Sequence, residues 1–338
     1  MPALRLRSGQ ALRLRSGQAT RNISICFLPG SLFNLLKIKM EKMENYQDYK
    51  AGYVALVGKP NVGKSTLLNA LLKHKLSIVT HKPQTTRKQV LGILSEEHYQ
   101  IIFIDTPGLI QPKYNLQKIM MKYLQEAMAD ADLIAYMIDA SAPIQDFSQV
   151  REKILPLSKP VILVLNKIDL IPRERLLPLI ERYKQVYDFT AYVPVSAAQN
   201  DGLEDLLREI ERLLPYSPPY FPPEYITNQQ ERFFVSEIIR EKIFQFYGEE
   251  IPYSCHVQIE EFKERDKGKD YIRAVIFVEK NSQKGILIGK GGQSIRRVGE
   301  RARQDIEAFL SRPVFLELYV KVLEAWRKKE IKLKQLGY

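Results

Sequence analysis

The segment Gly58–Ser65, which reads GKPNVGKS, constrains the fold of this chain more than any other feature. It follows the apolar run Tyr53–Val57, which is typical of a strand, and it leads into the helical pattern Lys64–Lys73. Glycines in a strand–loop–helix connection let backbone N–H groups and the helix N-terminus surround phosphate groups. Lys64 is therefore expected to contact the β- and γ-phosphates of a nucleotide, and Ser65 to supply a hydroxyl to Mg²⁺. A glycine-rich turn without a ligand is the alternative.

Three further motifs each follow an apolar run that is typical of a strand. They are DTPG at Asp105–Gly108, NKID at Asn166–Asp169 and SAA at Ser196–Ala198. Asp105 can hold Mg²⁺ through water, and the Gly108 N–H can contact the γ-phosphate. Open α/β sheets bind ligands at the carboxyl ends of their strands. Four motifs in this order at one sheet edge favour a guanine nucleotide site over a turn without a ligand.

The last two motifs carry the residue types that recognise a guanine base. The Asp169 carboxylate can accept from the ring N–H and exocyclic amine of guanine, and each charge-assisted bond is worth roughly 1.5–3 kcal/mol. Asn166 can join the base loop to the phosphate loop, the Lys167 stem can cover the base, and the Ala197 N–H can donate to the guanine carbonyl. The expected nucleotide-binding residues are Gly58, Lys59, Pro60, Asn61, Val62, Gly63, Lys64, Ser65, Thr66, Asp105, Thr106, Pro107, Gly108, Asn166, Lys167, Asp169, Ser196, Ala197 and Ala198.

Strand-like and helix-like segments alternate between residues 49 and 214. The expected strands are Tyr53–Val57, Gln89–Ser95, Tyr99–Ile104, Leu133–Asp139, Val161–Leu165 and Ala191–Val195. The expected helices are Lys64–Lys73, Asn115–Ala129, Gln149–Leu157, Arg173–Tyr187 and Leu203–Leu214. This order predicts an α/β P-loop domain over residues 49–214, with a mainly parallel sheet and helices on both faces. The short polar turn between the second and third strands predicts an antiparallel hairpin at one edge.

Residues 215–228 are expected to link this domain to a second domain at residues 229–338. Pro215–Pro223 contains five prolines in nine residues, which cannot continue a helix and favour a stiff linker. Residues 228–338 carry 22 basic and 17 acidic side chains, whereas residues 41–227 carry 22 of each. This excess of positive charge indicates that the C-terminal part binds a polyanion.

The segment Gly289–Gly292, which reads GKGG, forms a GxxG loop between two expected helices within Gln283–Leu310. In KH domains such a loop holds the backbone of single-stranded RNA, because glycines let phosphates approach and a basic residue neutralises them. The helix–strand–strand–helix–helix–strand order matches the type II KH arrangement, so we expect an α+β KH domain. A helix C-cap turn and a solvated charged helix face are the alternatives. The expected RNA-binding residues are Lys284, Gly289, Lys290, Gly291, Gly292, Arg296 and Arg297.

The motifs GKPNVGKS, QTTR at Gln84–Arg87, DTPG, NKID and SAA together resemble the Era family of translation-factor-type GTPases. The resemblance extends over nearly all of the chain except its N-terminal extension. It implies that Thr86 completes the Mg²⁺ shell when its loop closes on GTP; a solvated polar loop is the alternative. It also implies that the KH domain binds the 3′ end of small-subunit ribosomal RNA during maturation of the 30S subunit.

The resemblance also bears on catalysis. The expected Mg²⁺ ligands are Ser65, Thr86 and Asp105, and the expected catalytic residues are Lys64, Thr86, Gly108 and Asn61. The resemblance implies that Asn61 helps to bind a monovalent cation, K⁺, at the place where an arginine finger otherwise acts. Capping of a turn by Asn61 is the alternative. Leu109 follows DTPG where Ras has the glutamine that orients the attacking water. Hydrolysis by the protein alone is therefore expected to be slow and to rest on Lys64, Mg²⁺ and loop closure.

Residues 1–48 are expected to lie outside both domains. Ala3–Gln10 reads ALRLRSGQ and is repeated letter for letter at Ala11–Gln18. Residues 1–40 contain seven Lys and Arg and no Asp or Glu, which fits an organelle transit peptide or upstream sequence that precedes initiation at Met40 or Met43. The second reading is favoured and predicts a cytoplasmic protein. The first predicts an organelle matrix.

Other features of the chain limit its surroundings. Its two cysteines have no metal spacing, which indicates a reducing compartment without a disulfide framework. No run of ~18 apolar residues, the length of a membrane span, occurs. The tail Trp326–Tyr338 is basic, so we expect it to pack on the KH domain or on RNA, with weak peripheral contact with the inner face of the cell membrane as a secondary property. We expect a monomer.

These expectations combine into a molecular switch. GTP with Mg²⁺ orders the loop around Gln84–Arg87 and the segment after Asp105, the change passes across the proline-rich linker to the KH domain, and hydrolysis resets it. The alternative is an RNA-binding scaffold in which the bound guanine nucleotide is mainly structural.

Overall fold

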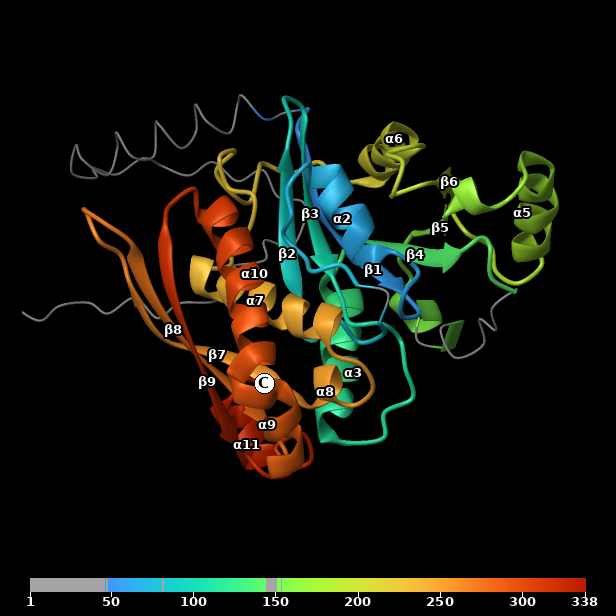
Figure 1. The fold of residues 1–338 in the computed structure, drawn as a ribbon. Coiled ribbons are helices and arrows are strands. Elements are labelled where there is room, and N and C mark those ends of the chain that lie inside the picture. The colour runs from blue at the N-terminus through green and yellow to red at the C-terminus, as the bar shows by residue number, and fades with distance from the viewer. Residues whose placement is uncertain (1–45, 47, 81, 144–150, 153) are drawn as a thin grey trace, which may run out of the picture. The chain divides into compact units, whose positions relative to one another are not determined.

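The sheet of the first domain has the order β2-β3-β1-β4-β5-β6 (Figure 1). The computed structural model describes residue 46 and residues 48–80, 82–143, 151–152 and 154–338. The six strands are β1 Lys50–Gly58, β2 Val90–Ser95, β3 Tyr99–Asp105, β4 Leu133–Asp139, β5 Val161–Asn166 and β6 Ala191–Val195. Strands β2 and β3 pair antiparallel at one edge and the other neighbours pair parallel, which confirms the predicted sheet and its hairpin.

Helices cover both faces of this sheet, as its apolar strands require. All six residues of β5 are buried, which is expected for a strand with packed layers on both sides. Helix α3 (Asn115–Asp130) packs on one face, and α2 (Lys64–Leu72) and α6 (Leu203–Leu213) pack on the other. In α3 the buried Leu116, Met120 and Leu124 recur every four residues and so lie along one side of the helix.

Two of the expected helices have different bounds in the structure. The expected helix Gln149–Leu157 lies partly outside the described residues, and the structure gives a 3₁₀ turn at Leu155–Leu157. The expected helix Arg173–Tyr187 is shorter, with a 3₁₀ turn at Arg173–Arg175 and helix α5 at Leu176–Lys184. Pro178 has no N–H to donate to the carbonyl four residues earlier, so regular α-helix begins only at Leu176.

The proline-rich segment is tied to the first domain over much of its length. Backbone hydrogen bonds join Ala51 N to Pro215 O at 3.2 Å and Ile93 N to Ile226 O at 2.9 Å. The buried Gln100 side chain accepts from two successive N–H groups of the segment, those of Tyr220 and Phe221, at 2.8 and 2.9 Å. These contacts to β1, β2 and β3 fix the path of the segment, in addition to the stiffness of its prolines.

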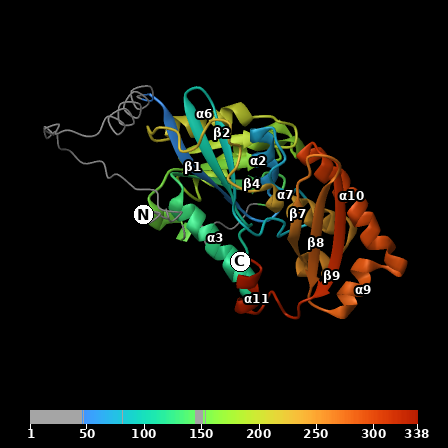
Figure 2. The ribbon, with the colours of Figure 1, turned by 90° about the vertical axis from the view of Figure 1, so that its left-hand side faces the viewer.

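The second domain contains a three-stranded sheet with helices on one face (Figure 2). Its elements are α7 Glu231–Phe246, α8 Ile251–Ser254, β7 His256–Lys263, β8 Asp270–Val278, α9 Asn281–Ile288, α10 Gln293–Leu310 and β9 Val314–Val322. Strand β8 lies in the centre, antiparallel to β7 and parallel to β9. The predicted element order is confirmed except for α8, a single turn that the sequence analysis missed because it is only four residues long.

The C-terminal tail packs on the first domain as well as the second. Trp326 is fully buried and its Nε1 donates to Ser254 O at 2.9 Å, while Leu333 of α11 (Glu330–Gln335) joins the core cluster of α3. Leu116 N donates to Arg327 O at 3.0 Å, which fixes the tail to the start of α3. The prediction that the tail packs on the KH domain is thus confirmed only in part, since its apolar side also covers α3. No helix among the described residues is long and apolar enough to cross a membrane.

Candidate functional site

All four motifs lie at the carboxyl ends of neighbouring strands. Strand β1 ends at Gly58, β3 at Asp105, β5 at Asn166 and β6 at Val195, immediately before Ser196. The parallel pairing of these strands through β4 brings the loops that follow them to one edge of the sheet. The structure therefore places the predicted phosphate-binding and base-binding residues side by side.

The phosphate-binding loop holds the Lys64 ammonium group in its centre. Lys64 is 6% exposed, and its Nζ donates to Gly58 O at 3.1 Å and to Lys59 O at 3.0 Å. Burial lowers its pKa from 10.5 to about 8, although the charge of Asp105 acts in the opposite direction. Gly63 has a φ of 101°, and a Cβ there would lie 2.2 Å from Asn166 Nδ2. Only glycine therefore fits where the loop passes the base-binding strand.

Three oxygen-bearing side chains meet beside Lys64. The Ser65 Oγ donates to Asp105 Oδ2 at 2.8 Å and lies 3.0 Å from Thr86 Oγ1. Asp105 is fully buried, and burial raises the pKa of its carboxyl although Lys64 opposes the shift. Its Oδ1 is buried without a hydrogen-bond partner among the described residues. Hydroxyl and carboxylate oxygens suit Mg²⁺, and a cation here would satisfy this oxygen. These residues fit the predicted metal site.

The Asn166 amide joins the base loop to the phosphate loop, as predicted, and also bonds to the second base loop, which was not predicted. Its Nδ2 donates to Val62 O at 2.7 Å and its Oδ1 accepts from Ala197 N at 3.0 Å. The Ala197 N–H, expected to donate to the guanine carbonyl, is thus engaged by Asn166. The Ser196 Oγ donates to Asp169 Oδ1 at 2.5 Å, which orients the carboxylate expected to bind the base.

Asp139 is a residue of this site that the sequence analysis missed. It ends β4, the strand between the phosphate loop and the NKID motif, and its Oδ2 pairs with Lys167 Nζ at 2.6 Å. This pair holds the Lys167 stem in place, and Lys167 itself has a left-handed φ of 66°. The position of Asp139 at the end of an apolar strand-like run was the one available signal.

The cavity over the phosphate loop is small. It has a volume of about 60 Å³ and is lined on one side by Asn61 and Lys64 and on the other by Thr80 and Thr86. Asn61 has a left-handed φ of 63°, a conformation that asparagine tolerates. None of the base-binding residues Asn166, Asp169 and Ala197 lines this cavity, so it covers only the phosphate side of the site.

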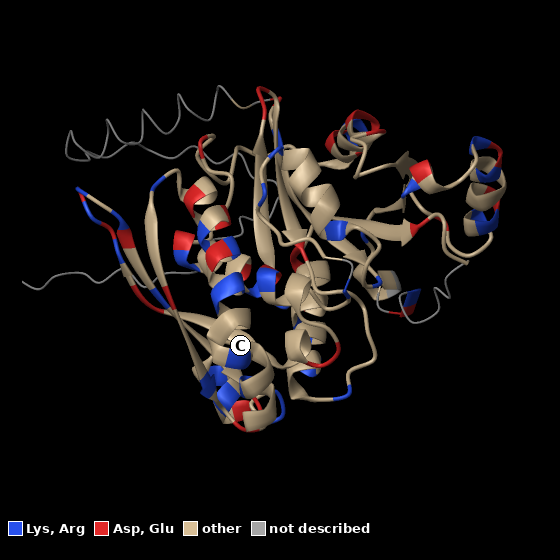
Figure 3. Ribbon diagram, in the orientation of Figure 1, with Lys and Arg blue, Asp and Glu red and all other residues tan. Residues whose placement is uncertain are grey.

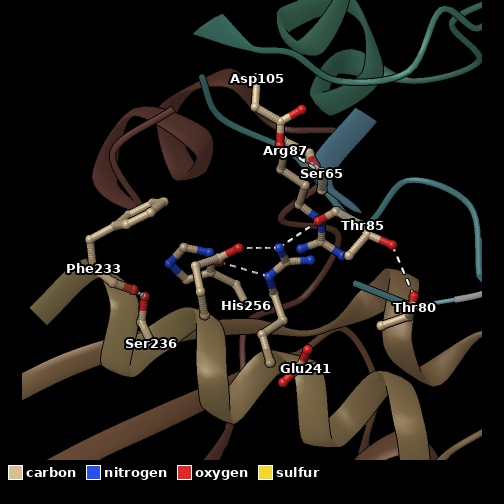
Figure 4. Close-up of polar contacts among 12 residues, drawn as sticks. Ser65, Thr80, Thr85, Arg87, Asp105, Phe233, Ser236, Glu241 and His256 are labelled. Carbon is tan, nitrogen blue, oxygen red and sulfur yellow. Dashed lines mark hydrogen bonds and ion pairs between the residues drawn. The ribbon is translucent and has the colours of Figure 1, made fainter. Parts of the chain in front are cut away.

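The same loop is attached to the second domain, a link that the sequence analysis did not predict. Arg87 is 5% exposed and donates to three backbone carbonyls, those of Cys255 at 2.6 Å, Pro252 at 3.0 Å and Tyr253 at 3.1 Å. Arg240 of α7 donates to Thr85 O. Figure 4 shows Arg87, Thr85 and Thr80 lying over α7, the helix that carries Ser236 and Glu241.

A charged network reinforces this attachment. Glu241 of α7 is 2% exposed, accepts from Val79 N at 3.3 Å and pairs with Lys75 Nζ at 2.6 Å. Lys242 pairs with Asp305 of α10 at 2.5 Å. Helices α7 and α10 are thus connected to the segment that leads into the Thr86 loop.

The GxxG loop joins α9 to α10, as predicted. Gly289, Gly291 and Gly292 all have left-handed φ values, of 73°, 56° and 77°. A Cβ on Gly289 would lie 2.2 Å from Ser294 Oγ, whereas the other two face open space. Lys290 is exposed at the tip of the loop. Glycines at the last two positions therefore leave room for an incoming phosphate group.

The basic side chains near this loop differ in their exposure and in whether they form ion pairs. Arg296 and Arg297 are exposed, while Lys284 is half-buried. Figure 3 shows Lys and Arg lying beside Asp and Glu over much of this domain, and Arg303 is paired with Glu307 at 2.9 Å. Arg296 and Arg297, at the N-terminal end of α10, are thus exposed and have no ion pair among the described residues.

A groove next to the loop could accept nucleotide bases. A cavity of about 500 Å³ lies between α10 and β9, and its walls include Gly292, Arg296, Leu316 and Leu318. Ile286, three residues before the GxxG loop, is 57% exposed. Of the predicted RNA-binding residues, Gly292 and Arg296 thus line this partly apolar groove.

Comparisons with known proteins agree with both domains. A family model described as "50S ribosome-binding GTPase" matches residues 53–167, and one described as "KH domain" matches residues 250–327. The chain is 47% identical over 292 residues to "GTPase Era" of Caldanaerobacter subterraneus, covering 86% of this chain and 98% of that protein. It is 44% identical, again over 292 residues, to "GTPase Era" of Clostridium botulinum, with 86% and 98% covered.

Two solved structures are similar over the same region. One is Era in complex with MgGDPNP and nucleotides 1506–1542 of 16S ribosomal RNA, with a TM-score of 0.83, 42% identity and coverage of 86% of this chain and 99% of that one. A variant of Aquifex aeolicus Era bound to GDP and AlF₄⁻ matches with the same TM-score of 0.83, 42% identity and the same coverage of 86% and 99%. The P-loop and KH domains, their order and these relatives together show that the chain belongs to the Era family of GTPases.

Proposed function

We propose that this Era-family GTPase uses bound GTP to control how firmly its KH domain holds the 3′ end of small-subunit ribosomal RNA during assembly of the 30S subunit. One observation carries the proposal: the loop that bears Thr86, next to the metal site, is anchored in the second domain through Arg87. Relatives solved with a GTP analogue, Mg²⁺ and the 16S RNA end support the choice of ligands.

The chemistry assigned to the nucleotide site is phosphoryl transfer to water. Mg²⁺ would be held by Ser65, Thr86 and Asp105 and would neutralise developing charge on the phosphates. Lys64 would leave the carbonyls of the loop and donate to the β- and γ-phosphates, and the Gly108 N–H would contact the γ-phosphate. Leu109 packs against the core beside α3, so no side chain at that position orients the attacking water. We therefore expect slow turnover by the protein alone.

Guanine selection is assigned to Asp169. Its carboxylate, oriented by Ser196, would accept from the two donors on the edge of guanine. Because Asn166 Oδ1 already engages the Ala197 N–H, the guanine carbonyl would have to share that donor or meet the neighbouring Ala198 N–H. The remaining nucleotide-binding residues keep the roles predicted from the sequence.

The signal to the KH domain is assigned to the Thr86 loop. Any movement of the Thr86 loop as Mg²⁺ and nucleotide bind would shift Arg87 relative to the three carbonyls that it bonds, or carry them with it. Pro252 and Tyr253 belong to α8, and Cys255 immediately precedes β7. The Trp326 ring follows β9, and its centroid lies 5.8 Å from Arg87 Cζ. The loop therefore contacts residues that adjoin the sheet of the KH domain, which is a shorter route than the proline-rich segment.

RNA binding is assigned to the GxxG loop and the groove beside α10. Phosphates would approach Gly291 and Gly292, with Lys290, Arg296 and Arg297 neutralising them and Lys284 nearby. Unpaired bases would lie on the apolar wall formed by Leu316 and Leu318.

The test is GTP hydrolysis by the full chain with and without RNA that carries the small-subunit 3′ end. We expect RNA to change the turnover rate, with a scrambled RNA of equal length as control. An identical rate with and without the specific RNA would instead favour a scaffold in which the guanine nucleotide is mainly structural.

Several finer assignments also belong to the proposal. They are the role of Asn61 in seating K⁺, a monomeric state, a cytoplasmic location, and weak contact of the basic tail with anionic membrane. The domain limits at residues 49–214, 215–228 and 229–338 are proposed as well. Residues 1–40, for which a transit peptide or an upstream start was predicted, lie outside the described residues.

A further inference from the structure

A second cavity lies where the two domains meet, away from the phosphate loop. Its volume is about 320 Å³, near the lower end of the range for small-ligand pockets, roughly 300–1,000 Å³. Figure 4 shows four of its lining residues, Arg87, Phe233, Ser236 and His256. The charged side chains and the histidine in its wall are Arg87, Lys88, Arg232, Glu237, Arg240 and His256. Four cationic side chains thus share the wall with a single acidic side chain, Glu237.

Arg240 is incompletely satisfied in this wall. It is 2% exposed, its Nε donates to Glu237 Oε1 at 2.9 Å, and its Nη2 donates to Glu237 and to Thr85 O. Its Nη1 is buried and has no hydrogen-bond partner in the part of the chain that the structure describes. An unsatisfied buried donor is costly, by about 1–3 kcal/mol or more for a charged group. Glu237 therefore does not fully compensate the positive charge that surrounds it.

The neighbouring groups respond to the same excess of positive charge. Burial lowers the pKa of Lys88, with Arg240 acting in the same direction and Glu237 against it. Burial and the charges of Arg87, Lys88 and Arg240 hold the pKa of His256 well below its usual value. The ring is thus neutral near neutral pH, and its Nδ1 lies 3.2 Å from Tyr338 Oη. An anion in the cavity would relieve this repulsion.

We propose that this cavity binds a small phosphorylated anion of about the size of pyrophosphate, held by Lys88, Arg232 and Arg240. Phosphate oxygens accept charge-assisted hydrogen bonds from lysine and from the fork of an arginine, and the wall offers both. Lys88 belongs to the loop that follows Thr86, and Arg232 and Arg240 belong to α7. A bound anion would therefore join the nucleotide-binding domain to the KH domain at a place separate from the phosphate loop and the GxxG loop.

The test titrates inorganic pyrophosphate into the full chain with GDP saturating the phosphate loop. Free Mg²⁺ is omitted, because pyrophosphate would sequester it. Calorimetry should show saturable binding of one anion, and the NMR signal of the His256 ring should move toward its protonated position. The chain has four histidines, so this signal can be assigned by substitution. No saturable binding while GDP is bound would overturn the proposal.

Single substitutions show whether pyrophosphate binds in this cavity. Lys88→Gln should weaken pyrophosphate binding by about tenfold, as expected for one charge-assisted contact, and should leave GDP affinity unchanged. Lys118→Gln, an exposed lysine on α3, is the matched control and should change neither. Equal pyrophosphate affinity in Lys88→Gln would place the anion elsewhere. A 5′-phosphorylated RNA oligonucleotide that binds in a Lys88-dependent manner where pyrophosphate does not would overturn the small-anion proposal in favour of an RNA end.

Discussion

The Lys64 ammonium group should make nucleotide affinity depend on pH. In the nucleotide-free site burial lowers its pKa from 10.5 to about 8, although Asp105 opposes the shift. Phosphate oxygens favour the charged form, so a bound nucleotide raises this pKa again. Binding must therefore take up a proton wherever the empty site has lost one, and GDP affinity should fall as the pH rises above 8.

The size of the change in GDP affinity follows from the pKa of Lys64. A group with a pKa of about 8 is roughly one-tenth protonated one unit above it, whereas at about pH 7 it is almost fully protonated. The Kd for GDP should therefore rise roughly tenfold, about 1.4 kcal/mol, between about pH 7 and pH 9. The phosphates of GDP, with a second pKa of about 6, are already ionised over this range.

The stability of the nucleotide-free protein should change with pH in the opposite direction to its GDP affinity. Without nucleotide, Lys64 binds fewer protons in the native than in the unfolded state between its lowered pKa of about 8 and 10.5. Its contribution to the free energy of unfolding should thus rise with pH in that window.

Calorimetry in two buffers of different ionisation enthalpy measures the proton uptake directly. We expect uptake of up to one proton per GDP at about pH 9, and almost none at about pH 7. Lys64→Arg, whose guanidinium stays charged throughout this pH range, should lose the pH dependence of GDP binding whatever its affinity. A Kd that stays constant from pH 7 to 9 in the unmodified protein, or the absence of proton uptake, would refute the reasoning.

Three further predictions concern the base, the RNA and the monovalent cation. Asp169→Asn should weaken GTP binding by roughly 100-fold, since two charge-assisted bonds are lost, and should improve binding of xanthosine triphosphate; unchanged GTP affinity in equilibrium titrations would contradict the base assignment. Lys290→Glu should weaken binding of the ribosomal 3′-end RNA by about tenfold in filter-binding assays, while the exposed Lys184→Glu on α5 should not; equal losses would remove the GxxG loop from the RNA site. Replacing K⁺ by Na⁺ should slow GTP turnover, and this sensitivity should disappear in Asn61→Ala; identical rates in both salts would leave Asn61 as a turn residue.

Much of the fold and of the nucleotide site could be predicted because its signals are local. Strand β5 is an uninterrupted apolar run, and the phosphate loop, the metal site and the NKID motif each occupy a few consecutive residues at a strand end. Parallel sheets bring such ends together, so the side-by-side placement of Lys64, Asp105 and Asn166 follows from their order. The GxxG loop was predictable for the same reason, since its glycines are adjacent in sequence.

The contacts between the domains could not be predicted in this way. Arg87 lies beside a motif that the sequence marks, but its partners are carbonyls more than 160 residues later, as in the bond to Cys255. Backbone carbonyls carry no sequence signal, and Trp326 gives no indication that it packs beneath that guanidinium. The engagement of Ala197 by Asn166 was missed because it depends on the relative position of two loops. Such long-range geometry requires the folded structure.

The central claim is that the nucleotide sets the strength of RNA binding through the Thr86 loop. The most direct measurement is the affinity of the full chain for small-subunit 3′-end RNA, with a non-hydrolysable GTP analogue and with GDP. A coupling of about 1–3 kcal/mol predicts that the two affinities differ by roughly 5- to 150-fold. The difference should shrink in Arg87→Ala, which keeps none of the three carbonyl bonds, and persist in Arg182→Ala, an exposed arginine on α5. Equal RNA affinities in the two nucleotide states of the unmodified protein would contradict the account.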